Sequence, residues 1–238
     1  MGTRRTFLVS GANQGLGMHT VHQIAQTPGV IVFMGSRRLS AAQEAIAAFD
    51  PPIDASSIVV PVQLDITDAS SISEAHSFIS FYLTERGIDG LDVLINNAAI
   101  GLETTSDMKE TFEVNVFGTV ALTTTFRPLI QIGGAILNIS SRMGSMVLIG
   151  QLPIAMAHAY SSSKSALNNM TVVWAREEKE KGSGIRVVSI CPGFNKTRIN
   201  NWEGSMHPSE GCEIIVRTAL EKEGRTGVFF NKDGDLPW

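Results

Sequence analysis

The stretch TFLVSGANQGLG, residues 6–17, joins an apolar, β-branched run to a cluster of three glycines. The glycines are Gly11, Gly15 and Gly17, which gives the spacing G-x-x-x-G-x-G. The first glycine permits a tight turn off a strand, and the other two let the backbone and a helix N-terminus approach a pyrophosphate. The stretch therefore predicts a strand, a phosphate-binding loop and a helix in direct succession.

The rest of the chain repeats this alternation of apolar runs and helix-like stretches. We expect strands at residues 6–11, 30–36, 57–65, 91–98, 134–141, 185–193 and 226–231. We expect helices between them at residues 15–27, 40–49, 68–86, 107–131, 156–181 and 209–222. Several apolar runs are continuous, which is typical of strands covered on both faces. The pattern predicts one α/β domain over residues 1–238, of the Rossmann-type doubly wound class, with a parallel seven-stranded sheet and helices on both faces.

Composition excludes several function classes. The net charge of −4 over 238 residues gives no reason to expect nucleic acid or an anionic membrane as a partner. No apolar run reaches the roughly 20 residues that a membrane-spanning helix needs. The two cysteines, Cys191 and Cys212, form no disulfide framework, so we expect a reducing, cytoplasmic location. Histidines and cysteines show no metal-ligand spacing, and no metal is expected.

Two arginines, Arg37 and Arg38, follow the second expected strand. In dinucleotide-binding folds, an acidic residue about 20 residues after the glycines binds the ribose 2′-hydroxyl of NAD. A guanidinium group at this point would instead pair with a 2′-phosphate. The sequence therefore predicts NADP(H) as cofactor, the alternative being that these arginines are only solvated surface charges.

Seven motifs in the same order resemble the classical short-chain dehydrogenase/reductase family over nearly the whole chain. They are SGANQGLG (10–17), LDITD (64–68), NNAA (96–99), NVFG (115–118), ILNISS (136–141), YSSSK (160–164) and PGFNKT (192–197). Arg37 and the closing TGVFFNKDGDLPW look most like the NADPH-dependent carbonyl-reductase branch. The resemblance implies a small-molecule carbonyl or alcohol substrate.

The resemblance also implies roles for four catalytic residues. Tyr160 would donate a proton to the substrate oxygen, Ser141 would bond the developing alkoxide, and Asn115 would support a water chain to Lys164. Lys164 would hold the nicotinamide ribose. Its spacing from Tyr160 is about one helical turn, so the two side chains share a face, and we expect the ammonium to lower the phenol pKa.

The cofactor site implied by the same motifs is larger. It comprises Gly11, Asn13, Gln14, Gly15, Leu16, Gly17, Arg37, Arg38, Asp65, Ile66, Asn97, Ala98, Tyr160, Lys164, Pro192, Gly193, Asn195 and Thr197. Asp65 would contact the adenine, and Thr197 the carboxamide or phosphate side of the cofactor.

The chain also departs from the family pattern. Ser141 precedes Tyr160 by nineteen residues, so residues 142–159 are expected to bulge or extend over the pocket mouth, and Ser145 is an alternative to Ser141. An apolar substrate surface or simple packing would account for Met143, Met146, Met156, Trp202 and Met206. We interpret Cys191 as a buried small hydrophobe.

Three functions stay open at this stage. The first is reversible NADPH-dependent reduction of a ketone or aldehyde. The second is reduction of a carrier-bound 3-oxoacyl group, for which Arg142, Lys196 and Arg198 would supply a sparse basic patch. The third is a catalytically silent NADP(H) sensor. A homodimer or homotetramer through residues 107–131 and 156–181 is expected from the resemblance, with a monomer as the alternative.

Overall fold

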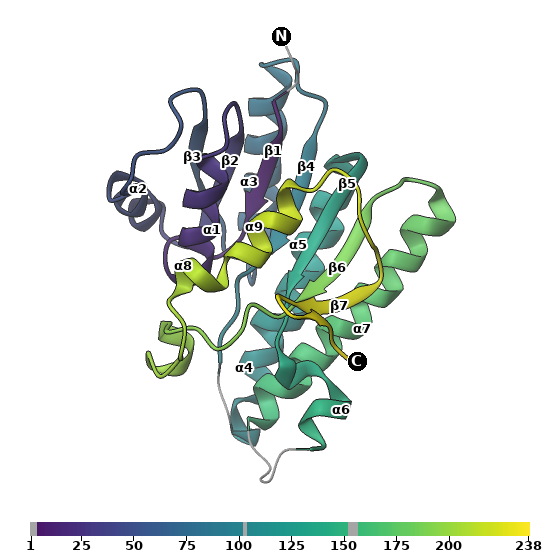
Figure 1. Cartoon of the computed structure of the whole chain (residues 1–238). Helices are drawn as coiled ribbons and strands as arrows, with labels where there is room; N and C mark the ends of the chain where they lie inside the picture. Colours follow the sequence, from purple (N-terminus) through teal and green to yellow (C-terminus); the bar gives the residue numbers. More distant parts are fainter. Residues whose placement is uncertain (1–3, 102–103, 152–156) are drawn as a thin grey trace.

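A computed structural model describes residues 4–101, 104–151 and 157–238 (Figure 1). Its sheet has the strand order β3-β2-β1-β4-β5-β6-β7-β8, parallel from β3 to β7. The strands are β1 (Thr6–Val9), β2 (Ile31–Ser36), β3 (Ile58–Gln63), β4 (Leu91–Asn96), β5 (Ile130–Ile139), β6 (Arg186–Ile190), β7 (Val228–Asn231) and β8 (Gly234–Asp235). The predicted α/β fold with a parallel seven-stranded sheet is confirmed, and β8 adds an antiparallel strand at the edge.

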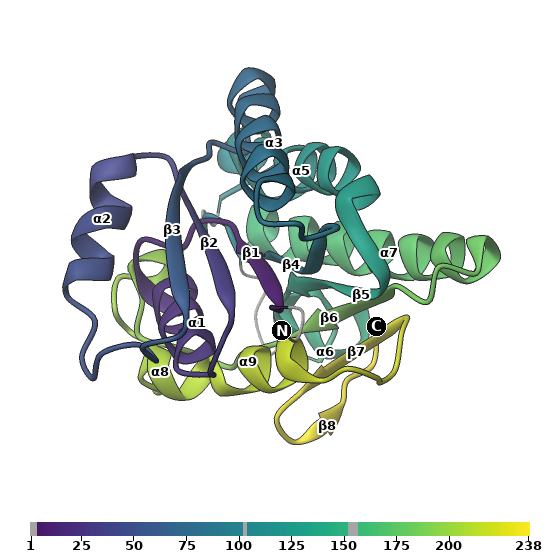
Figure 2. The ribbon, with the colours of Figure 1, turned by 90° about the horizontal axis from the view of Figure 1, so that it is seen from above.

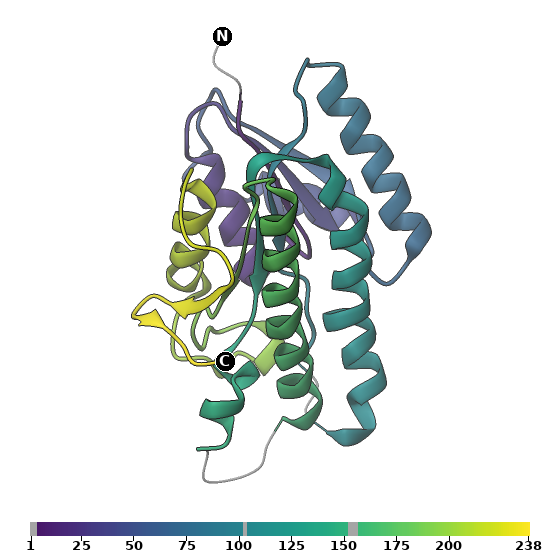
Figure 3. The ribbon, with the colours of Figure 1, turned by 90° about the vertical axis from the view of Figure 1, so that its right-hand side faces the viewer.

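Helices cover both faces of this sheet (Figures 2 and 3). On one face lie α1 (Gly15–Ala25), α2 (Leu39–Ala47), α8 (Pro208–Gly211) and α9 (Glu213–Leu220). On the other face lie α3 (Ala69–Thr84), α4 (Met108–Phe112), α5 (Thr119–Phe126) and α7 (His158–Lys181). A short helix, α6 (Met146–Ile149), follows β5. In the described part of the chain, no helix combines the length and apolar character needed to cross a bilayer.

Alternate residues of the central strand fill two separate cores. Phe7 and Val9 of β1 pack in the core beneath α1 and α9, and Leu8 packs in the core beneath α3 and α5. All three side chains are fully buried. A strand covered on both faces has no solvent side, which explains why this run is continuously apolar.

Several boundaries differ from the sequence expectation. The expected helix 107–131 contains a π-helical turn, Glu113–Gly118, and β5 begins at Ile130 instead of residue 134. Ile130 pairs with Leu91 before an irregularity in the register, which extends β5 beyond its regular part. The short β8 was not expected because it depends on a turn in which Asn231 Oδ1 accepts from the backbone N–H groups of Asp233 and Gly234.

Candidate active site

The glycine loop after β1 is built by close backbone approach. Gly11 and Gly15 have φ of 61° and 55°, values that favour glycine. A Cβ on Gly11 would lie 2.8 Å from Ala98 Cα. A Cβ on Gly17 would lie 2.7 Å from Gly11 O and would overlap the Asn97 side-chain amide. The loop therefore has no space for a side chain at Gly11 or Gly17, and its backbone packs directly against the chain after β4.

The segment after β4 holds this loop in place. Asn97 Nδ2 donates to Ser10 O at 2.9 Å and to Gly11 O at 3.0 Å. In return, Ser10 Oγ accepts from the backbone N–H groups of Asn97 and Ala98, each at 3.1 Å. Asn97 and Ala98 thus shape the glycine loop, and Ser10 has a structural role that its place in the motif did not reveal.

The expected adenine and 2′-phosphate region lies at the ends of β2 and β3. Arg37 and Arg38 are exposed, and neither forms an ion pair within the described ranges. Asp65 is partly buried and accepts from the backbone and the hydroxyl of Thr67. Ile66 is buried. Two neighbouring guanidinium groups without an ion pair in the described residues therefore follow β2.

The remaining loop residues vary in exposure. Asn13 and Leu16 are partly buried, and Gln14 is exposed before the first turn of α1. Leu16 packs against the core beneath α1. The first turn of α1 therefore starts at the glycine loop, with its N–H groups at the carboxyl edge of the sheet.

The loop after β6 meets the glycine loop. A Cβ on Gly15 would contact Thr197 Cγ2 at 3.4 Å. Asn195 is buried, and its Nδ2 donates to Pro192 O at 2.9 Å and to Gly193 O at 3.0 Å. The Asn195 side chain therefore holds the backbone of this loop. The cofactor contact that the motif implied for Asn195 stays a prediction.

Tyr160, Ser141 and Lys164 are brought together where β5 ends against the start of α7. Ser141 follows β5, and its hydroxyl accepts from Met143 N at 3.2 Å and lies near enough to the Tyr160 side chain to lower the pKa of the phenol. Lys164 is 3% exposed and its Nζ donates to Ile139 O at 2.8 Å. The same nitrogen lies 5.6 Å from the centroid of the Tyr160 ring. A phenol, a hydroxyl and an ammonium thus share one site.

Burial dominates the titration of this group. Burial raises the pKa of Tyr160 to about 12, although the Ser141 hydroxyl acts in the opposite direction. Burial also lowers the pKa of Lys164 to about 8. The pKa of the phenol is therefore raised, opposite to the direction expected from Lys164, because desolvation dominates and the ammonium donates to the carbonyl of Ile139.

Asn115 lies in the π-helical turn Glu113–Gly118 and joins three segments. Its Nδ2 donates to Ile100 O at 2.9 Å and to Ser163 Oγ at 3.0 Å, and its Oδ1 accepts from Ile100 N at 2.9 Å. Ser163 in turn donates to Tyr160 O at 2.7 Å. Such π turns occur frequently at functional sites. Here the turn fastens the chain after β4 to the first turn of α7.

The long connection between Ser141 and Tyr160 contains α6. Ser145, the alternative to Ser141, is fully buried, and its Oγ accepts from Leu148 N at the start of α6. Met146 is 72% exposed. Val147 N donates to Trp238 O at 3.4 Å, which connects the C-terminal residue to α6. Met156, expected on the substrate surface, lies outside the described residues.

The other expected apolar residues are placed differently from one another. Trp202 is 63% exposed and has a left-handed backbone, with φ of 67°. Met143 and Met206 are partly buried, and Met206 lies against Gly193. Exposed apolar atoms from α6 and from the loop after β6 are therefore available at the carboxyl edge of the sheet.

Cys191 is a site neighbour that sequence reasoning missed. It is buried directly after β6 and lies near enough to influence the pKa values of both Tyr160 and Lys164. Burial raises the pKa of this thiol, so the interpretation as an unreactive small residue agrees with its surroundings. The signal that could have located it is the pairing of β6 with β5, which brings the ends of both strands to one edge.

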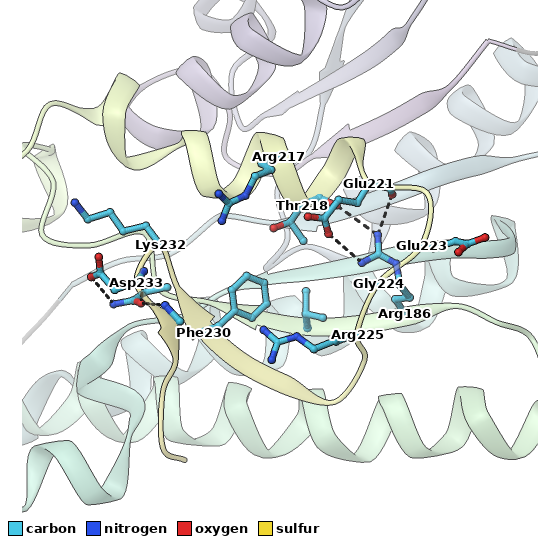
Figure 4. A pocket seen from close by; sticks show the side chains of 13 residues that line it. Arg186, Arg217, Thr218, Glu221, Glu223, Gly224, Arg225, Phe230, Lys232 and Asp233 are labelled. Carbon is cyan, nitrogen blue, oxygen red and sulfur yellow. Dashed lines mark hydrogen bonds and ion pairs between the residues drawn. The ribbon is translucent and has the colours of Figure 1, made fainter.

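A hollow of about 460 Å³, separate from the candidate active site, lies between α9 and the β7–β8 hairpin (Figure 4). Arg186 faces Glu221 at 3.8 Å, and Arg225 pairs with Asp235 at 2.6 Å. None of the residues expected in the catalytic or cofactor site lines this hollow. Within the part of the chain that the structure describes, no three His, Cys, Asp or Glu side chains form a metal-binding group.

Comparison with known proteins agrees with this geometry. The sequence profile of the family described as short chain dehydrogenase matches residues 5–207. A short-chain dehydrogenase of Penicillium roqueforti, anuI, is 33% identical, and the match covers 92% of this chain and 90% of that protein. The carbonyl reductase [NADPH] 1 of Macaca fascicularis is 27% identical, with 94% of this chain and 95% of that protein covered.

A solved structure is similar over the whole fold. The NADPH-bound carbonyl reductase from chicken fatty liver superposes with a TM-score of 0.79 at 27% identity. The superposition covers 99% of this chain and 100% of that one.

Proposed function

The chain belongs to the short-chain dehydrogenase family, and we propose that it reduces a ketone or aldehyde to an alcohol with NADPH, reversibly. As a family member it is an oxidoreductase that acts on carbonyl or alcohol groups of a small molecule with a nicotinamide dinucleotide. The observation that carries the finer proposal is the placement of Ser141 and of the buried Lys164 beside Tyr160.

Each of these side chains has a chemical task in the proposed reaction. With a pKa of about 12, the Tyr160 phenol is protonated at neutral pH and can donate to a substrate oxygen. The Ser141 hydroxyl is placed to stabilise negative charge on that oxygen. Lys164, with a pKa of about 8, can return a proton toward the site. The bound nicotinamide would supply or accept the hydride.

Two features of the chain support a phosphorylated dinucleotide. The loop through Gly11, Gly15 and Gly17 carries no side chain at three positions at the start of α1, where a pyrophosphate would meet backbone N–H groups. Arg37 and Arg38 are exposed without ion pairs in the described residues, so both are available to a 2′-phosphate. The two carbonyl reductases above, one named for NADPH and one solved with it, support the same choice.

The decisive experiment replaces Tyr160 with Phe. We expect turnover on a panel of aldehydes, ketones and quinones to fall roughly 10²–10⁴-fold, the usual contribution of a positioned general acid. The dissociation constant of NADPH, followed by nicotinamide fluorescence, is expected to change less than about threefold. Wild-type turnover in the Tyr160→Phe variant would remove the assignment.

The chain offers a matched control for this substitution. Tyr82, on α3, is the other of the two tyrosines in the chain. The Arg86 guanidinium lies 3.6 Å from its ring centroid. Tyr82→Phe removes the same hydroxyl from another part of the fold and is expected to keep full turnover. The wild-type protein could bind NADPH without any free carbonyl compound of the panel supporting its oxidation. In that case carrier-bound 3-oxoacyl substrates are the next to assay.

We also propose a homodimer through the helical face that carries α5 and α7. Phe117, in the π-helical turn before α5, is 58% exposed, and Val172 and Val173 on α7 are 43% and 42% exposed. Burying them against a second copy would remove apolar surface from water. Light scattering after size exclusion should give twice the mass of 25.6 kDa, and a monomeric mass would reject the proposal.

A further inference from the structure

One turn of helix α7 beyond Tyr160 and Lys164, a third polar residue lies on the same side of the helix. Tyr160, Lys164 and Asn168 are spaced at i, i+4 and i+8, so they lie on the same face of the helix. Asn168 is 3% exposed. Its Oδ1 accepts from Ser140 Oγ at 2.7 Å, and its Nδ2 donates to Gly144 O at 3.2 Å. One amide therefore bonds to the chain on both sides of Ser141.

This part of the chain fits tightly against α7. A Cβ on Gly144 would lie 2.8 Å from Lys164 C and 2.9 Å from Lys164 O. Ser165 Oγ also donates to Gly144 O, at 3.0 Å. On the strand side, Ser140 N donates to Ile190 O at 2.8 Å. The residues that flank Ser141 are thus fixed by hydrogen bonds, and α7 supplies most of them.

We propose that Asn168 is a positioning residue that holds the Ser141 hydroxyl against Tyr160. This inference rests on the proposed function. A carboxamide is suited to the task because it presents an acceptor and a donor at once, one for a hydroxyl and one for a carbonyl. A side chain without these groups would leave the buried Ser140 hydroxyl without its acceptor. It would also remove one of the donors to Gly144 O.

The effect on turnover follows from geometry. A misplacement of about 1 Å at a reacting group can lower a rate on the order of 10²-fold. Asn168→Leu has a similar shape and removes both hydrogen bonds without adding a charge. We expect its kcat to fall about tenfold to a hundredfold, with the dissociation constant of NADPH within about threefold of wild type. Ser140→Ala removes one of the two bonds and is expected to show a smaller loss.

A pH profile separates positioning from a merely structural role. The groups that face Tyr160 are Lys164 on the same helix, Cys191 at the end of β6 and Ser141 after β5. The Ser141 hydroxyl lowers the pKa of Tyr160. If Asn168→Leu displaces Ser141, the basic limb of the kcat/KM profile for carbonyl reduction, which requires the protonated phenol, should move to higher pH.

The matched control is a buried hydrogen bond that does not touch this segment. Asn96 Nδ2 donates to Thr123 Oγ1 at 2.9 Å, and Thr123 is 1% exposed. Thr123→Val is expected to lower the Tm with an unchanged pH profile. The proposal is overturned if Ser140→Ala and Asn168→Leu keep the wild-type kcat and profile, or if Thr123→Val reproduces their changes. Should Asn168→Leu not fold, Ser140→Ala decides alone, and a Tyr160→Phe variant with full turnover would instead reject the function itself.

Discussion

The candidate site has two halves that are constructed differently. The cofactor half is the glycine loop of residues 11–17, and the catalytic half is Ser141, Tyr160 and Lys164 with their supports on α7. The cofactor half depends on missing atoms, because Gly11 and Gly17 approach their neighbours so closely that a Cβ would overlap them. The catalytic half depends on added groups, because Lys164 and Asn168 on α7 bond to the chain around Ser141. The first half is therefore sensitive to any enlargement, whereas the second is sensitive to the loss of single polar atoms.

Under the proposed function, this difference would allow one chain to bind a large cofactor and position a small substrate. A dinucleotide is recognised along its backbone-facing phosphates, which many N–H groups can contact together. A single carbonyl oxygen is reached by only one or two side chains, so each of these must be held by its own partners. We therefore expect substitutions in the two halves to affect binding and turnover separately.

The largest effect expected on cofactor affinity tests the cofactor half. Gly17→Ala places a methyl group 2.7 Å from Gly11 O and against the Asn97 amide that holds the loop. Overpacking of this kind costs about 1–3 kcal/mol. We expect the dissociation constant of NADPH, measured by fluorescence titration, to rise at least about tenfold to a hundredfold.

Gly29→Ala is the control for that substitution. Gly29 has φ of 73°, but a Cβ there would meet nothing within 4 Å. The variant should lose about 1 kcal/mol of stability from backbone strain and keep its affinity for NADPH. An unchanged NADPH affinity in Gly17→Ala would show that the loop adjusts to a methyl group, and the contrast between the two halves would fail.

Local patterns in the sequence predicted most of the framework. The glycine spacing after residues 6–9 indicated both the turn and the start of α1. The helix expected at residues 156–181 ends at Lys181, where Gly182 follows with φ of 66°. These features depend on neighbours a few residues apart, so a single stretch of sequence contains the information.

The supports of the catalytic half could not be predicted in this way. Asn168 bonds to Ser140, twenty-eight residues earlier in the chain, and Cys191 faces Tyr160 only because β6 pairs with β5. The direction of the Tyr160 pKa was also wrong, since a helical spacing reveals a neighbouring charge but not the extent of desolvation. The roles of the candidate residues stay predictions until the variants are measured.

A smaller effect concerns the choice of cofactor. Arg37→Gln removes one exposed guanidinium at the end of β2. Hydrogen bonds to charged groups contribute about 1.5–3 kcal/mol, so the affinity for NADPH should fall roughly tenfold or more, with NADH affinity nearly unchanged. Arg176→Gln, whose side chain is 80% exposed on α7, should alter neither. Equal affinities of wild type for NADH and NADPH would contradict the proposed role of Arg37.

The smallest expected effect is on stability and tests the catalytic half through Lys164. Its pKa is about 8 in the folded protein against 10.5 for an ordinary lysine, so the unfolded chain binds more protons between these values. Stability from this group therefore rises with pH across that window and is lost as pH falls through about 8. Lys164→Met abolishes the titration and leaves the Ile139 carbonyl without its donor. In urea unfolding at pH 7.5 and 9.5, the stability of wild type relative to Lys164→Met should increase with pH. A constant or falling difference would mean that Lys164 is not desolvated, and that its ammonium is available to the Tyr160 phenol as the helical spacing first suggested.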